Sequence, residues 1–394
     1  MGKNLVLIGG RAVDPAKGLS KGLGEHVSGA GSNQYVIREA GSGAVTNRAY
    51  AVSTVRGTSG DDYLIGTDQA EWIMGDDGND TLEGLGGGDD LWGGSGWDTV
   101  SYWHAVKVDL ARSVATSLNG EEGTDQLFGI EAVEASDEND VLIGDYKDND
   151  LIGFGGNDSI EGGRGADILA GGLGNDTLVA GEGNDSLYGG KGNDVYRIDA
   201  VSDYIFELVD SGTDWLYASG LGTYVLADNV ERLILTGAVN SSATGNAKEN
   251  VITGNAGKNF LKGMGGADDI NGGKGKDTLE GGAGSDKFVF SSALKNNVDL
   301  IVDFDVVRDV IALDNDVFNA FFLENVTLGQ EEFYVTNGAI NQAHDADDRI
   351  IYNATTGKLY YDADGNGVGV AVEFARLGNT THPTITHQDF IIVA

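Results

Sequence analysis

Large apolar residues recur at every ninth position in three stretches of the chain. The stretches cover residues 57–101, 135–197 and 245–289, and they divide into five, seven and five rows of nine. The eighth column of all 17 rows is apolar or aromatic, from Leu64 in the first row to Phe288 in the last. With 40% apolar residues overall, chance fills that column with a probability on the order of 10⁻⁷. The period therefore predicts stacked repeating units rather than a disordered linker.

Two more columns of these rows are equally regular. Fifteen rows begin with glycine, and the sixth column is acidic in 14 rows and asparagine in three (Asn149, Asn250 and Asn259). Glycine permits positive φ and a close approach of backbones, so we expect the first six residues of a row to form a turn. The last three residues are expected to form a short strand whose eighth-column side chain points inward. Two rows then make one coil, and coils stack at roughly 4.8 Å.

Stacking of coils brings the sixth-column acids of alternate rows to the same edge. Two carboxylates about 5 Å apart repel by about 3 kcal/mol at an effective dielectric near 20, so a ladder of them favours a bridging cation. Calcium accepts six to eight oxygens in flexible geometry, whereas magnesium prefers a small octahedral shell, and zinc prefers the His or Cys that the repeats lack. At each position the alternative is a solvated turn residue. The predicted calcium ligands are Asp62, Asp80, Asp89, Asp98, Asp140, Asp158, Asp167, Asp176, Asp185, Asp194, Asp268, Asp277 and Asp286.

The number of ions follows from the pairs of alternate rows, i and i+2, whose sixth-column residues share an edge. The three arrays contain three, five and three such pairs, which gives an upper limit of 11 ions. Rows with asparagine lose a charge, and Glu71 adds a methylene, so weak sites there reduce the expectation to roughly eight ions.

The best rows, "GGRGADILA", "GGLGNDTLV" and "GGKGNDVYR", match the pattern G-G-x-G-x-D-x-U-x, in which U is a large apolar residue. On this pattern the chain resembles the RTX (repeats-in-toxin) family of calcium-binding proteins. The resemblance implies an all-β fold: a parallel β-roll or β-helix solenoid with a C-terminal β cap. It also implies calcium as the cofactor and export by a type I secretion apparatus.

The segments between and after the arrays continue the β pattern. Residues 102–134 contain the alternating "VKVDL" and the turn-like "NGEEGTD", and residues 198–244 contain "YIFELV", "WLYASG" and "VERLILTG". Both connectors are predicted to be degenerate coils or hairpins that extend the core. Residues 290–394 resemble the non-repeat cap of the serralysin-like group, which fits the need of a solenoid for closed ends.

The two ends of the chain are less regular. Residues 1–56 are predicted to be a partly disordered lead-in, with candidate strands at 34–37 and 50–55. The chain ends in "THPTITHQDFIIVA", an acidic residue followed by a short apolar tail, which resembles the uncleaved signal of type I secretion substrates. The alternative is a final edge strand of the cap, and both interpretations are compatible. The first residues lack the long apolar region of a secretory signal peptide.

Residues 362–373, "DADGNGVGVAVE", satisfy the EF-hand calcium-loop pattern. The flanking "KLYY" and "VGVAVEF" are strand-like, and Gly369 occupies a position that should be a large apolar residue. We therefore favour a β-hairpin turn over a calcium loop at this place.

Charge and composition restrict the partners. The net charge of −37 repels nucleic acid and anionic lipid and attracts cations. There is no cysteine, which excludes disulfides and thiolate chemistry, and no long apolar run, so no membrane-spanning helix is expected. We expect a secreted, extracellular bacterial protein.

Enzymatic motifs are missing from the sequence. There is no H-E-x-x-H and no G-x-S-x-G, the five histidines are scattered, and the segment 1–56 that precedes the repeats is too short for a catalytic domain. We therefore expect a non-enzymatic structural or interaction module for adhesion, a surface matrix or host association, with cell-surface polysaccharide or a host surface as partner. The alternative is the calcium-binding module of a polysaccharide-modifying enzyme such as an alginate epimerase. A pore-forming toxin would need apolar helices that the chain lacks.

Overall fold

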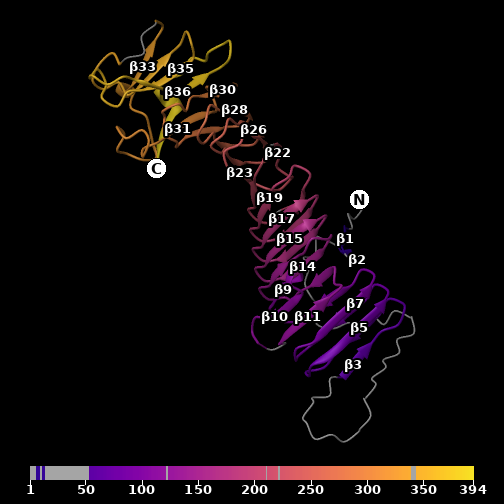
Figure 1. The fold of residues 1–394 in the computed structure, drawn as a ribbon. Coiled ribbons are helices and arrows are strands. Elements are labelled where there is room, and N and C mark those ends of the chain that lie inside the picture. The colour runs from indigo at the N-terminus through magenta and orange to yellow at the C-terminus, as the bar shows by residue number, and fades with distance from the viewer. Residues whose placement is uncertain are drawn as a thin grey trace, which may run out of the picture. The chain divides into compact units, whose positions relative to one another are not determined.

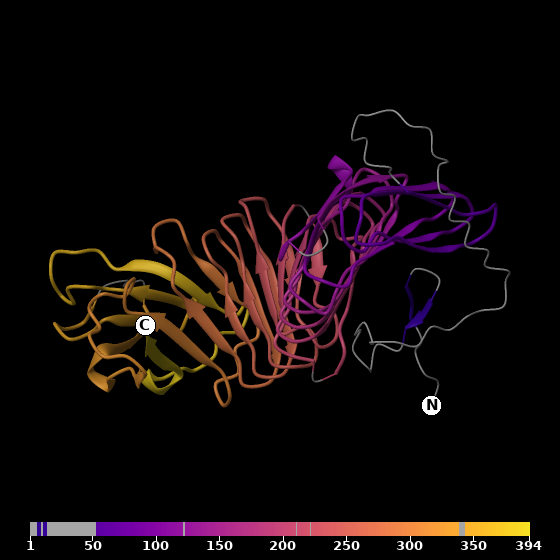
Figure 2. The same cartoon turned by 90° about the horizontal axis from the view of Figure 1, so that it is seen from below.

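The computed structural model describes residues 6–8, 11–13, 53–120, 123–209, 211–220, 222–338 and 343–394. These residues form strands and three short 3₁₀ turns, Leu110–Arg112, Gln330–Glu332 and His387–Asp389, and the strands stack mainly in parallel (Figures 1 and 2). The predicted all-β parallel solenoid is confirmed. None of the described residues forms a helix with the length and apolar character that crossing a membrane requires.

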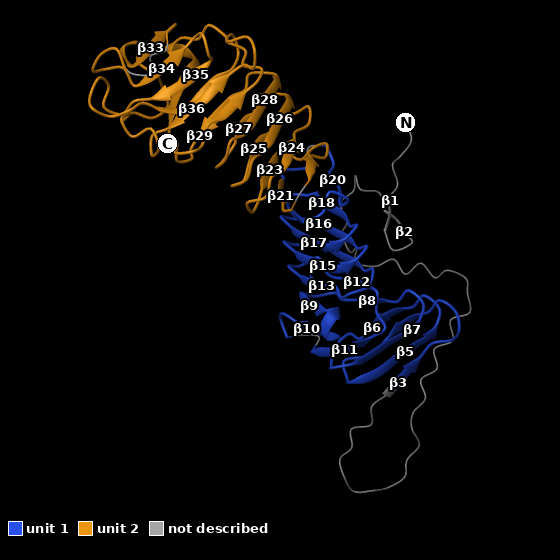
Figure 3. Ribbon diagram, turned by 45° about the horizontal axis from the view of Figure 1, so that its top comes forward, with its two compact units in different colours: residues 1–214 blue, residues 215–394 orange. Residues whose placement is uncertain are grey.

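The chain divides into two compact units, residues 1–214 and 215–394 (Figure 3). The division lies inside the connector predicted for residues 198–244. The first unit contains the first two arrays, and the second unit contains the third array and the C-terminal segment.

Unit 1 contains two ladders of strands that alternate along the chain. One ladder consists of β3 (Ser53–Arg56), β5 (Glu71–Asp77), β7 (Asp90–Ser95), β13 (Val141–Ile143), β15 (Ser159–Gly165), β17 (Thr177–Gly183) and β19 (Val195–Ile198), with a connector inserted after β7. The other ladder has eight strands: β4 (Tyr63–Ile65), β6 (Thr81–Glu83), β8 (Thr99–Ser101), β12 (Ala132–Glu134), β14 (Asp150–Gly155), β16 (Ile168–Leu173), β18 (Ser186–Lys191) and β20 (Tyr204–Phe206). Within the arrays each strand pairs with its counterpart two rows later, as Ile160 does with Leu178.

The eighth column forms the core of both units. Leu64 is 6% exposed, and the other sixteen residues of the column, including Tyr196 and Phe288, are fully buried. Because strand side chains alternate, each residue stacks on its counterpart one coil away and removes its apolar surface from water. The predicted inward ladder is confirmed.

The strands of several rows are longer than the three residues predicted. In β15 and β17 the pairing continues past Ile160 into the next row, where Gly163 pairs with Gly181 and Gly165 with Gly183. The prediction of a six-residue turn is therefore wrong for these rows. The chain bends at the second-column glycine, where Gly163 has φ +100°, and then resumes the ladder.

The connector at residues 102–134 adds a small antiparallel meander to unit 1. It contains β9 (Val106–Asp109), β10 (Val114–Ser117) and β11 (Thr124–Phe128). The strand β10 pairs antiparallel with both β9 and β11, while β11 pairs in parallel with β7 and β9 pairs in parallel with β13. The meander thus extends the ladder, as predicted.

Unit 2 repeats the two-ladder arrangement. The first ladder contains β21 (Trp215–Ala218), β23 (Arg232–Leu235), β25 (Val251–Thr253), β27 (Asp269–Asn271), β29 (Lys287–Phe290), β31 (Val310–Asp314), β37 (Phe390–Val393) and β32 (Val326–Thr327). The second has nine strands: β22 (Thr223–Val225), β24 (Ser242–Thr244), β26 (Phe260–Gly265), β28 (Thr278–Ala283), β30 (Asp299–Ile301), β36 (Val372–Leu377), β35 (Lys358–Tyr361), β34 (Ile350–Asn353) and β33 (Phe333–Thr336). Beyond β36 the strands β36, β35 and β34 pair antiparallel.

Aromatic side chains replace the aliphatic column in the C-terminal segment. The ring of Phe374 packs edge-on against Phe290 and Phe318, with centroids 5.2 and 5.1 Å away, and Phe318 packs against Tyr361. The last strand, β37, pairs in parallel with β31 and antiparallel with β32. A final strand is confirmed, but the prediction of an edge strand is wrong because β37 has a partner on each side.

The lead-in contributes a two-stranded antiparallel pair, β1 (Val6–Ile8) and β2 (Arg11–Val13), that the sequence did not predict. The candidate strand at residues 50–55 overlaps β3. The candidate at residues 34–37 lies outside the described residues.

Candidate metal centres

The sixth-column acids are buried rather than solvated. Twelve of the thirteen predicted ligands are at most 3% exposed, and only Asp62, in the first row, is partly exposed. Each lies just before the strand that carries the inward eighth-column residue, so the side chain turns toward the core. The alternative of a solvated turn residue is wrong at these twelve positions.

One oxygen of each acid is fixed by the neighbouring coil. The backbone N–H of Asp140 donates to Asp158 Oδ1, that of Asp158 to Asp176 Oδ1, and that of Asp176 to Asp194 Oδ1, each at 2.8 Å. These bonds join residues two rows apart and confirm that acids of alternate rows share an edge. The same bond links pairs in the other arrays: Asp62–Asp80, Glu71–Asp89, Asp80–Asp98, Asn250–Asp268, Asn259–Asp277 and Asp268–Asp286.

The second carboxylate oxygen, Oδ2, is buried without a hydrogen-bond partner at most predicted ligands. A carboxylate oxygen is only an acceptor, so leaving it unpaired in the interior costs about 1–3 kcal/mol or more. A bound cation removes that cost. Among the described residues these oxygens belong to Asp80, Asp89, Asp98, Asp158, Asp167, Asp176, Asp185, Asp194, Asp268, Asp277 and Asp286.

The first-column glycines leave room for these oxygens. A Cβ built on Gly162 would lie 2.5 Å from both Asp167 Oδ2 and the carbonyl oxygen of Ala180. A carboxylate and a backbone carbonyl from the next coil thus converge beside one glycine. Both are hard oxygen donors of the kind calcium prefers, and the buried set contains no His or Cys.

Burial makes the ionised form of the ladder carboxylates unfavourable and so raises their pKa. It raises the pKa of Asp158 to about 8 and that of Asp167 to about 7, and the carboxylates of neighbouring coils raise both further, while a backbone hydrogen bond opposes the shift. The pKa of Asp268 is raised to about 7 for the same reasons. Near neutral pH the metal-free ladder therefore needs either protons or cations.

Two predicted ligands, Asp62 and Asp140, differ from the others. Asp62 Oδ2 accepts from the backbone N–H and hydroxyl of Thr58, and Asp140 Oδ2 accepts from the backbone N–H and hydroxyl of Ser136. Both acids stand in the first row of an array. Their second oxygen is used to stabilise the turn that opens the array.

In the asparagine rows, the side-chain amide has hydrogen-bond partners within the protein. Asn259 Oδ1 accepts from the N–H of Asn255 at 2.8 Å, and its Nδ2 donates to the carbonyl of Ser241 at 3.1 Å. Asn149 makes the equivalent bonds with Asp145 and Glu131. An amide supplies its own donor, so these positions have no unpaired oxygen that requires a cation, in keeping with the weak sites predicted there.

The ladder continues through residues that the repeat pattern missed. Asp299 accepts from the N–H of Asp277 at 2.9 Å, and a Cβ built on Gly272 would lie 2.7 Å from Asp277 Oδ2 and 3.1 Å from Asp299 Oδ2. The signal that would have found such residues is an Asp two positions before a buried apolar residue, without the glycine spacing. The acids that extend the ladder in this way are Asp125, Asp203, Asp214, Asp299 and Asp309.

Comparison with known protein families identifies the repeats that carry this geometry. Seven overlapping stretches match the family model described as the RTX calcium-binding nonapeptide repeat (4 copies): residues 53–82, 65–100, 134–169, 161–196, 170–205, 244–279 and 253–288. The chain contains RTX calcium-binding repeats. Such repeats bind calcium, and the matched stretches coincide with the three arrays of buried acids. No curated protein matches the chain.

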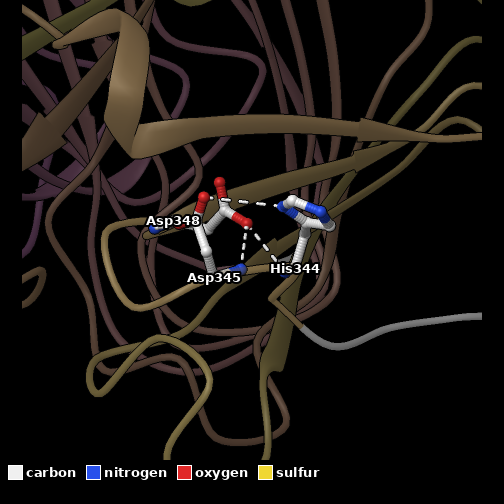
Figure 4. A group of neighbouring side chains, drawn as sticks. All are labelled: His344, Asp345 and Asp348. Atoms are coloured by element: carbon white, nitrogen blue, oxygen red, sulfur yellow. Dashed lines mark hydrogen bonds and ion pairs between the residues drawn. The ribbon is translucent and has the colours of Figure 1, made fainter.

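A cluster outside the arrays contains His344, Asp345 and Asp348 (Figure 4). Asp348 is buried, and its Oδ2 accepts from the backbone N–H groups of His344 and Asp345 at 2.7 and 3.0 Å. Asp345 in turn accepts from the N–H groups of Asp347 and Asp348. These hydrogen bonds from backbone N–H groups stabilise the turn at residues 344–348.

The EF-hand-like stretch at residues 362–373 joins two antiparallel strands, β35 and β36, so the predicted hairpin is confirmed. Glu373, the last residue of the loop pattern, lies on β36 and forms an ion pair with Lys358 Nζ at 2.9 Å. Asp364 accepts from the N–H of Gly369 within the turn.

Proposed function

We propose that this protein is secreted and works outside a bacterial cell as a calcium-dependent structural or interaction module without catalytic activity. The observation that supports it is the row of buried, unpartnered Oδ2 oxygens in the RTX repeats. Such a row is unfavourable in a metal-free chain and favourable when each rung holds a hard cation.

The proposed function couples folding to calcium. When bound, calcium supplies positive charge and six to eight coordination positions. The Oδ2 atoms and first-column carbonyls would hold it, while the Oδ1 hydrogen bonds keep adjacent coils in register. Because such a site does not exist in the unfolded chain, the free energy of binding becomes free energy of folding. Extracellular modules typically bind calcium at about 10⁻⁴–10⁻³ M, so the chain folds after export.

A calcium titration followed by circular dichroism tests this function. We expect the strand signal to appear with millimolar calcium, to vanish with EGTA, and to remain low with equal magnesium. A strand signal that is unchanged in EGTA contradicts coupled folding. A response to magnesium equal to that of calcium contradicts the selectivity.

Export by a type I apparatus is the second part of the proposal. It is supported by the resemblance of the C-terminal tail to signals of such substrates. A passenger protein fused to residues 290–394 should reach the medium of cells that carry a type I apparatus. The same passenger fused to residues 135–197 serves as the control and should stay inside. Equal retention of both fusions argues against a signal in the C-terminal segment.

A polysaccharide-binding role is the second candidate function. Trp72 and Trp92 are 47% and 44% exposed on β5 and β7, and the ring of Trp92 stacks on Phe128 of β11 with centroids 3.9 Å apart. Exposed flat rings can pack against sugar faces, and the net charge of −37 favours neutral over anionic glycans. Glycan affinity of the calcium-loaded protein that falls in Trp92→Ala supports this candidate, and equal affinity of both proteins opposes it.

A further inference from the structure

The end of the second array departs from the repeat in two columns. Tyr196 of β19 occupies the eighth column, which is aliphatic in the other rows of unit 1. Glu207 follows β20 and stands one coil, 18 residues, after Gly189, so it takes the place of a first-column glycine in the next coil. Both substitutions place oxygen atoms where the repeat has none.

The two unusual residues bond to each other inside the protein. The Tyr196 hydroxyl donates to Glu207 Oε1 and accepts from the N–H of Gly189 at 2.8 Å. Glu207 Oε2 accepts from the N–H of Leu208 at 3.0 Å and from the hydroxyl of Ser211 at 2.9 Å. Tyr196 is fully buried and Glu207 is 4% exposed. The Glu207 carboxylate is therefore turned inward and held in one orientation.

Two ladder acids meet this carboxylate. Asp194 donates its backbone N–H to Asp214 Oδ1 at 2.8 Å, and one ligand oxygen from each of Asp194, Glu207 and Asp214 lies within 4.8 Å of the other two. Asp194 is fully buried, and its Oδ2 has no hydrogen-bond partner. A Cβ built on Gly189 would overlap both Asp194 Oδ2 and Glu207 Oε1, so the unpartnered oxygen points into the cluster.

We propose that Asp194, Glu207 and Asp214 hold one calcium ion in a site of their own at the end of the second array, and that it is the tightest calcium site of the chain. The proposal rests on the proposed function, in which the arrays bind calcium. Calcium affinity rises with the number of charged ligands and with the rigidity of the site. This site has a third carboxylate where a first-column glycine would offer only a carbonyl, and Tyr196 and Ser211 fix it.

The tightest site determines where folding of the array begins. The ion that binds first organises the last coil of the array, and neighbouring coils then add to an existing edge. Tyr196 is a positioning residue in this scheme, because its hydroxyl orients Glu207.

Calcium binding by the full-length chain tests the site. Equilibrium dialysis with metal analysis would compare the wild type, Glu207→Gln, and a control, Glu161→Gln, whose carboxylate is exposed on β15. We expect Glu207→Gln to weaken the tightest binding event by about tenfold or more, as losses around a metal site commonly do, and the control to leave it unchanged. An unchanged tightest event in Glu207→Gln overturns the proposal.

Two further variants keep the test decisive. Glu207→Gly restores the glycine of the repeat, so it should fold in calcium and still lose the tightest event; retention of that event overturns the proposal. Terbium, a calcium substitute, should emit on tyrosine excitation at the first equivalent in the wild type, and Tyr196→Phe should remove that emission. Undiminished emission places the ion elsewhere.

A wild type that binds no calcium contradicts the proposed function itself. A wild type that binds several calcium ions, none of which depends on Glu207, contradicts only this site.

Discussion

At the scale of the residue, each ladder aspartate has two oxygens with different roles. In Asp176, Oδ1 accepts from the backbone N–H of Asp158 and joins two coils, while Oδ2 is buried and unpartnered. The first role needs only an acceptor, and the second needs a cation or a proton. Replacing such an aspartate with asparagine therefore keeps the acceptor Oδ1 and removes the charge that needs a cation or a proton.

Asp176→Asn should have effects of opposite sign with and without calcium. It keeps the Oδ1 bond and removes a buried charge, so in EGTA the folded state should gain about 1–3 kcal/mol. In calcium the ladder loses a ligand, and the calcium midpoint should rise about tenfold. Circular dichroism in EGTA, where the gain appears as additional strand signal, and a calcium titration measure this, with Asp199→Asn, an exposed acid, as the control. Destabilisation in EGTA would contradict the unpaired-charge account.

Four rows have positive φ in the second column although the residue there is not glycine. Met264 has φ +84°, and Asp76, Leu85 and Phe154 occupy the same column with φ between +65° and +74°. An L-residue pays about 1–2 kcal/mol for this conformation, whereas glycine does not.

Met264→Gly should therefore stabilise the calcium-loaded protein by about 1 kcal/mol. The side chain is 47% exposed, so little packing is lost. Phe260→Gly, at a 41% exposed position of the same strand outside the positive-φ set, is the control and should destabilise by about 0.5–1 kcal/mol. Chemical unfolding in calcium measures both. Equal losses in the two variants would mean that the backbone conformation of Met264 is not strained.

At the scale of the element, the acid ladder crosses from repeat strands into connector strands. The bond from Asp89 to Asp125 spans 36 residues and that from Asp277 to Asp299 spans 22, yet both have the geometry of the bonds between alternate rows inside the arrays. Strand pairing, rather than the nine-residue period, decides which acids meet. The connectors therefore contribute acids to the candidate calcium sites.

Asp299→Asn should weaken calcium binding in unit 2 although Asp299 lies outside every repeat. Its carboxylate shares the space beside Gly272 with Asp277 Oδ2, and burial raises its pKa to about 7. We expect at least one calcium ion fewer by metal analysis, while Asp316→Asn, an exposed acid of the same unit, should bind the full number. An unchanged count would limit calcium binding to the repeats.

At the scale of the whole molecule, many buried carboxylates titrate together. The pKa values of Asp158, Asp194 and Asp268 are about 8, 7 and 7 in the folded chain, mainly because of burial, against about 3.9 in an unfolded chain. Between pH 4 and 8 the folded metal-free state therefore binds more protons than the unfolded state. Its stability rises as the pH falls through this window and is lowest above pH 8.

In EGTA the strand signal should therefore be greater at pH 5.5 than at pH 8. With calcium the direction reverses, because protons compete for the same oxygens, and the calcium midpoint should rise as the pH falls below 7. Circular dichroism at both pH values measures this. High salt screens exposed charges, so the pH effect that remains when the measurement is repeated at high salt comes from the buried carboxylates. Loss of the pH effect at high salt would assign it to surface repulsion.

The amino-acid pattern is sufficient to predict the repeating part of the protein. The period of nine fixes which residues point inward and which acids meet across alternate rows, because neighbouring coils have the same length and strand side chains alternate. From this alone follow the parallel solenoid, the core from Leu64 to Phe288, and the thirteen candidate ligands.

Where the period breaks, the strand pairing has to be seen in the folded protein. After an insertion the register depends on which strand pairs with which, and pattern does not encode that choice. Pairing places Asp125 and Asp299 on the ladder, puts β37 between β31 and β32, and turns Glu207 toward Asp194. Burial is also a tertiary property, because it takes the surrounding coils to shield the carboxylates from water and make a cation necessary.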